Sequence, residues 1–127
     1  DEEQICLIYS MISEMTKKAL DSLKHSKKTE ELYERLTTPG LLGEVQPAEA
    51  MCDLVENEYI KRLLRNASDS YIRFALSTGR HKEEIKEERN KLTELLKNGE
   101  LKKAEKALDA YFKLLAKAVN EERGMNE

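Results

Sequence analysis

Residues that end helices occur at only a few points in this chain. Its 127 residues include five glycines and two prolines, and between these breaks apolar side chains recur every three or four positions. No stretch of any length alternates apolar and polar residues as a half-buried strand does. Long helices with short connections account for this pattern, so we predict an all-α antiparallel bundle of about six helices.

The breaks also set the predicted boundaries. Pro39 and Gly40 end the second helix, Pro47 suits the first turn of the third, and Asn98-Gly99 joins the last two as antiparallel neighbours. A polar tail is expected over about 120–127, and residues 1–127 are predicted to form a single domain. The predicted helices cover about 3–24, 27–37, 47–56, 58–78, 81–98 and 100–120.

Charge and composition exclude several classes of function. The formal net charge is −3, from 22 basic and 25 acidic residues, so nothing attracts the whole chain to nucleic acid or an anionic membrane. Cys6 and Cys52 match no metal or redox motif and suggest buried thiols in a cytoplasmic protein. His25 and His81 are interpreted as exposed histidines without metal-binding partners. No signal peptide or membrane-spanning segment is recognised.

An arginine interrupts an apolar stripe in the predicted fifth helix. Arg89 lies four residues after Ile85 and three before Leu92, so it faces the core with them. A buried charge is costly unless another group pairs with it. Tyr111 lies similarly among the apolar positions of the last helix, and Tyr71 is predicted to face inward from the fourth. We therefore list Arg89 first, with Tyr111 and Tyr71, as candidate ligand-binding residues.

Two segments resemble the C-terminal effector-binding domain, called FCD, of GntR-type transcription regulators of the FadR subfamily. The resemblance covers about residues 44–118 and is clearest in residues 87–100, EERNKLTELLKNGE, which are followed by Ala104, Ala107 and Leu108. Residues 51–64, MCDLVENEYIKRLL, resemble a second segment of the family. The resemblance implies an all-helical domain that senses an effector and dimerises.

The family's metal ligands are replaced in this chain. Many members bind a divalent metal through one Asp and three His, and those positions correspond here to Glu44, Ala48, Arg89 and Tyr111. Arg89 and Tyr111 are separated by the same number of residues as the family's last two histidines. A lone carboxylate does not hold a transition metal, so the resemblance implies a member without metal or other cofactor.

The resemblance gives Arg89 a specific role. Its guanidinium would supply the positive charge that a metal supplies in relatives, Tyr111 would add a neutral hydrogen bond, and a small carboxylate or acyl ligand would bind between them. The position of Glu44, where the family has its Asp, adds this residue as the fourth candidate in the ligand-binding site. The alternative is that Arg89 pairs with an internal acid, with Glu44 as the candidate, and the pocket is closed. For Tyr111 the alternative is ordinary core packing.

These features leave three functions to compare. The first is an effector-sensing domain that forms a homodimer and contacts DNA only through an N-terminal winged-helix domain, of which this sequence has no pattern. The second is a helical interaction or dimerisation module with no small ligand, which an apolar surface patch would indicate. The third is an enzyme, for which the sequence offers too few converging polar groups, and we predict that the chain is not one.

Overall fold

A computed structural model of the chain describes residues 1–126, and the last residue of the predicted tail, at position 127, lies outside this range. It confirms the predicted all-α fold: the described residues form six helices and no strand, with α4, η1 and α5 counted as one continuous helical run. The elements are α1 (Glu2–His25), α2 (Thr29–Thr37), α3 (Pro47–Cys52), α4 (Glu58–Asn66), η1 (Ala67–Ile72), α5 (Arg73–Ser77), α6 (Lys82–Lys97) and α7 (Leu101–Asn126).

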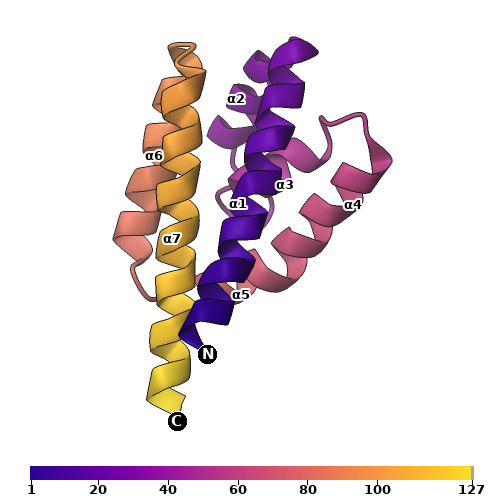
Figure 1. Cartoon of the computed structure of the whole chain (residues 1–127). Helices are drawn as coiled ribbons and strands as arrows, with labels where there is room; N and C mark the ends of the chain where they lie inside the picture. Colours follow the sequence, from indigo (N-terminus) through magenta and orange to yellow (C-terminus); the bar gives the residue numbers. More distant parts are fainter. Residues whose placement is uncertain (127) are drawn as a thin grey trace.

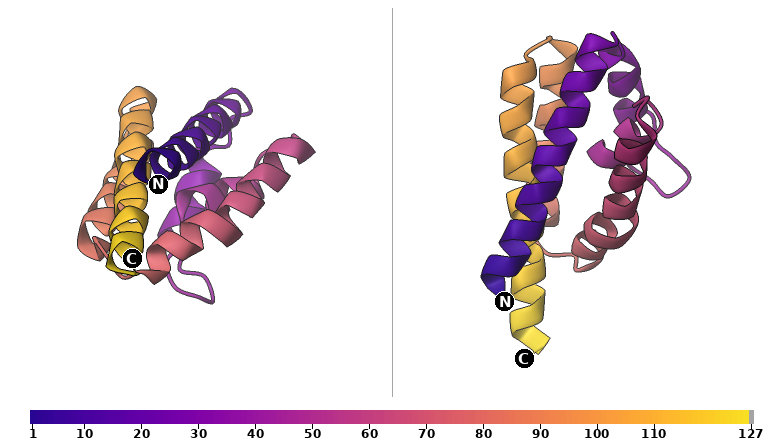
Figure 2. Two further views of the ribbon diagram at one scale, coloured as in Figure 1. Left: turned by 60° about the horizontal axis from the view of Figure 1, so that its bottom comes forward. Right: turned by 45° about the vertical axis from the view of Figure 1, so that its right-hand side comes forward.

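The longest helix, α7, packs between α1 and α6 and runs antiparallel to both (Figure 1). The shorter helices α2 and α3 contact each other, and α3 also contacts α1 and α4. Figure 1 shows α4 diverging from the upper part of α1, and both views of Figure 2 show the start of α1 beside the C-terminal half of α7. The connection over 38–46 leaves the bundle between α2 and α3 and lies near η1, α5 and α6.

Local sequence signals account for the helix ends. The Asp1 side chain accepts a hydrogen bond from the Gln4 amide at 3.1 Å, and the Asn57 side chain accepts from the Tyr59 amide at 2.9 Å. Pro47 occupies the first turn of α3, as predicted. Gly99, with a φ of 71°, makes the tight turn that sets α6 and α7 side by side.

A π-helical turn moves the buried face of the α4–α5 run by one residue. The prediction placed Tyr71 and Phe74 inward, and this is wrong: Tyr71 is 44% exposed and Phe74 is 49% exposed. Ile72 and Ala75 are buried instead. The π turn over η1 accommodates one residue more than an α-helical turn, so every side chain after it rotates by one position relative to an uninterrupted α-helix.

Three smaller expectations were also wrong. The third helix ends at Cys52 rather than near Glu56. Cys6 is exposed, because it lies in the first turns of α1, before Tyr9, the first buried residue of that helix. His81 is largely buried, with 17% of its side chain exposed. Its ring nitrogens lie 2.6 Å from Glu121 and 3.4 Å from Glu84.

The last helix continues beyond the predicted start of the polar tail. α7 remains helical through Asn126, six residues past Asn120. Glu121 contacts His81, and Glu122 accepts a hydrogen bond from Arg80 Nε at 2.8 Å. These contacts hold the end of α7 against the corner between α5 and α6.

Candidate functional site

Arg89 is buried in the core, as its position in the apolar stripe predicted. It is only 5% exposed and lies on α6 between Ile85 and Leu92. Its guanidinium donates to two backbone carbonyls. The Nε and Nη2 groups both reach Val45 O, at 3.0 and 2.8 Å, and Nη2 also reaches Leu36 O at 2.5 Å. Arg89 thus joins the end of α2 to the far end of the connecting segment.

Glu44 contributes little to holding this arginine. Its carboxylate lies 3.9 Å from Arg89 Nε and is 45% exposed. An ion pair of this length and exposure is weak, whereas the carbonyl bonds are short and buried. Backbone dipoles therefore provide most of the compensation for the buried charge, and the carboxylate provides the smaller part.

Tyr111 is buried beneath the same segment. Its hydroxyl donates to Gln46 Oε1 at 2.6 Å, and its ring meets Phe112 edge-on with centroids 5.1 Å apart. Burial raises the pKa of the Tyr111 hydroxyl well above its usual value, and the nearby Arg89 charge opposes part of that rise. The residue is a neutral donor that packs in the core and bonds to Gln46, and its contact with a ligand stays a prediction.

Of the four predicted site residues, Glu44 belongs to the segment 44–46, Arg89 and Tyr111 bond to that segment, and Tyr71 does not. Arg89 bonds to Val45, Tyr111 bonds to Gln46, and Glu44 lies beside Arg89. Ala48, where the resemblance predicts that relatives carry a histidine, is fully buried in the first turn of α3. Tyr71 lies elsewhere: its ring packs edge-on against Tyr9, with centroids 6.3 Å apart, because the π turn directs it toward α1.

A half-open cleft of about 1040 Å³ lies over this cluster, and we call it the Arg89 cleft. Its walls are the segment 40–46, the run through η1 and α5, and the first half of α6. The apolar part is made by Ile72, Leu76 and Ile85, with Leu41 and Leu42 at the tip of the segment. The charged side chains that line it are Arg73, Lys82, Lys86 and Arg89 on the basic side and Glu44 and Glu49 on the acidic side.

The basic side chains of α6 were not identified from the sequence. Lys82 forms no ion pair within residues 1–126, and Lys86 lies 3.9 Å from Glu44. Arg73 lies 3.9 Å from Asp69. Lysines spaced four apart share one helix face, a signal the sequence contained, but only the position of the 40–46 segment shows that this face borders a cleft.

Ser68 is another residue of the cleft that could not be identified from the sequence. It belongs to η1, is 8% exposed, and its hydroxyl has no hydrogen-bond partner among the described residues. A buried hydroxyl without a partner is uncommon and destabilising. A single serine gives no sequence signal of this kind, because its burial depends on the π turn.

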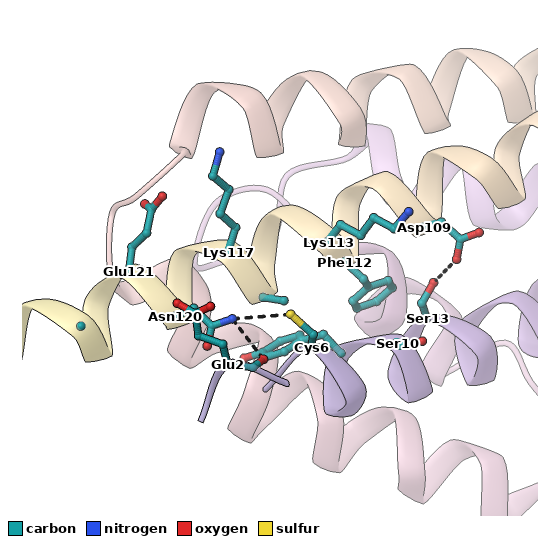
Figure 3. A pocket seen from close by; sticks show the side chains of 13 residues that line it. Glu2, Cys6, Ser10, Ser13, Asp109, Phe112, Lys113, Lys117, Asn120 and Glu121 are labelled. Atoms are coloured by element: carbon teal, nitrogen blue, oxygen red, sulfur yellow. Dashed lines mark hydrogen bonds between the residues drawn. The ribbon is translucent and has the colours of Figure 1, made fainter. Parts of the chain in front are cut away.

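A second groove, of about 730 Å³, runs between α1 and α7 (Figure 3). Tyr9, Phe112 and Ala116 line its apolar part. Some of its polar groups bond to one another: Ser13 donates to Asp109 at 2.7 Å at one end, and Asn120 lies 3.6 Å from Cys6 Sγ at the other. Two lysines, Lys113 and Lys117, line the groove together with three acidic side chains, so its charge suits an anion less well than that of the Arg89 cleft does.

Searches for further features and for known relatives gave negative results. No group of three or more His, Cys, Asp or Glu side chains is arranged to hold a metal ion within residues 1–126. None of the described helices has the length and apolar character needed to cross a membrane. No family model, curated protein or solved structure matches this chain. The resemblance to the FCD domain therefore stays a prediction.

Proposed function

We propose that this chain is the effector-sensing and dimerisation domain of a GntR/FadR-like transcription regulator. Its effector is a small anion, a carboxylate or acyl compound, which binds in the Arg89 cleft without a metal. The domain works in the cytoplasm as a homodimer and acts on DNA only through an N-terminal winged-helix domain. Its role is binding rather than catalysis.

The distribution of charge around the cleft carries this proposal. Four basic side chains line it against two acidic ones, although the chain as a whole has a formal charge of −3. Lys82 and Lys86 are exposed on α6, where Lys82 has no ion pair within residues 1–126 and Lys86 has only the long contact with Glu44, while Arg89 adds its charge from the interior. The apolar surface of Ile72, Leu76 and Ile85 suits the hydrocarbon part of such a ligand.

The bonds of Arg89 suggest how binding is transmitted. The guanidinium ties Leu36, near the end of α2, to Val45 in the wall of the cleft. A ligand that moves the 40–46 segment therefore also moves α2, which packs against α6, α3 and α1. An effector that prefers one placement of this segment shifts the domain toward that state.

The test is a calorimetric titration with small monocarboxylates at low salt. Lys82→Ala combined with Lys86→Ala should weaken binding about tenfold or more, and added salt should weaken it in the unmodified protein. The matched control combines Lys91→Ala and Lys97→Ala, exposed lysines of the same helix that do not line the cleft. Equal affinity in the two double variants would contradict the proposal.

A second candidate function rests on exposed apolar side chains. Leu7 and Met11 project from α1, one helical turn apart, and Leu63, Tyr71 and Phe74 are exposed along the α4–α5 run. Such side chains suit an interaction or dimerisation module that needs no small ligand. Sedimentation analysis distinguishes the two: a dimer that Met11→Ser and Phe74→Ser dissociate, in a protein that binds no anion, would favour this alternative.

A further inference from the structure

Both charged and uncharged polar side chains line the Arg89 cleft. The basic side chains Arg73, Lys82 and Lys86 come from α5 and α6. Two uncharged polar side chains, Ser68 and Gln46, come from η1 and from the residue before α3. A ligand that fills the cleft therefore meets neutral hydrogen-bonding groups as well as these basic side chains and the carboxylates of Glu44 and Glu49.

Ser68 is the stronger of the two neutral groups. Its hydroxyl is buried and has no partner within residues 1–126, so it can both donate and accept a hydrogen bond. The π turn of η1 directs Ser68 and Ile72 to the interior together. π turns are frequent at functional sites, where they position a side chain that a regular helix would turn away.

Gln46 supplies a second group that is already oriented. Its Oε1 accepts the Tyr111 hydroxyl at 2.6 Å, which fixes the side-chain amide. The Nε2 group then points away from that bond, and it donates to no acceptor in the described part of the chain. Ser68 and Gln46 thus offer donors at fixed positions.

We infer that Ser68 and Gln46 form a neutral subsite that binds an uncharged hydrogen-bonding group of the ligand. The inference rests on the proposed function and adds to it a class of ligand: an acid that carries a hydroxyl or carbonyl at the end remote from its carboxylate. Ile72, Leu76 and Ile85 contact the hydrocarbon between the two ends.

The experiment compares hydroxylated acids with plain acids of the same length. The probes are hydroxybutyrate, hydroxyhexanoate and hydroxyoctanoate, each with the hydroxyl on its last carbon, and butyrate, hexanoate and octanoate. Calorimetry should show that one hydroxylated acid binds about tenfold more tightly than its plain counterpart. Ser68→Ala should remove this preference by lowering the affinity for the hydroxylated acid to that for its plain counterpart.

Ser70→Ala is the matched control, because Ser70 is exposed on the same π turn and does not line the cleft. It should keep the preference, and Ser68→Ala should melt no lower than the unmodified protein, since it removes a hydroxyl without a partner. Plain acids that bind as well as hydroxylated ones at every length would overturn the neutral subsite alone. Failure of every acid to bind would overturn both the subsite and the proposed function.

Discussion

Replacing Arg89 by methionine tests what holds this buried charge. Methionine fills a similar volume but leaves the carbonyls of Leu36 and Val45 without their donors. Each buried acceptor left unpaired costs about 1–3 kcal/mol, so we expect a loss of about 3 kcal/mol in the free energy of unfolding. For a domain of this length, that corresponds to a fall of about 10 °C in melting temperature.

Two further variants distinguish the contribution of the carbonyl hydrogen bonds to stability from that of the ion pair. Glu44→Gln should cost less than about 0.5 kcal/mol, because the carboxylate is half exposed and 3.9 Å away. Arg89→Lys keeps the charge but lacks the planar fork that reaches two acceptors, so we expect about half the loss seen with methionine.

The assay is urea unfolding followed by far-ultraviolet circular dichroism, with Arg62→Met, an exposed arginine, as the control. A loss in Glu44→Gln equal to that in Arg89→Met would refute the reasoning, since the ion pair would then be the main partner. A loss below about 1 kcal/mol in Arg89→Met would refute it as well.

Three other results are expected. Burial raises the pKa of Tyr9 to about 12 and raises that of Tyr111 further. The melting temperature should therefore be constant below about pH 10 and fall as the pH rises toward 12. A melting temperature that does not change over this range would contradict the expectation. Glu121→Gln should speed amide exchange in the last turns of α7 about fivefold, because it weakens the contact with His81. Unchanged exchange would contradict this expectation. Leu41→Ser should change the free energy of unfolding by less than about 0.5 kcal/mol, because the side chain is fully exposed.

The helical bundle could be predicted from the sequence because the spacing of apolar residues and the residues that end helices are local signals. Helical spacing placed Arg89 and Tyr111 among buried positions, and Pro47 and Gly99 marked real helix ends. The same reasoning failed at Tyr71, because a π turn shifts the register and no residue type announces it. Periodicity therefore located the buried face well only where the helix is uninterrupted.

The site could be predicted only in part, for a different reason. The partners of Arg89 are backbone carbonyls, and any residue at positions 36 and 45 would provide the same acceptor. The contact between His81 and Glu121 joins residues 40 positions apart, and Ser68 is buried only because of the turn that contains it. These features depend on how the helices pack, which spacing along the chain does not specify.

The central claim is that an anion binds in the Arg89 cleft, and amide chemical-shift mapping by NMR tests it most directly. Titration with hexanoate and with its hydroxylated counterpart should move the amide signals of residues 40–46, 68–76 and 82–89 together, with a single affinity. The amides of the groove between α1 and α7, around Cys6 and Lys117, should stay in place. Shifts confined to that groove, or no shifts at saturating acid, would contradict the account.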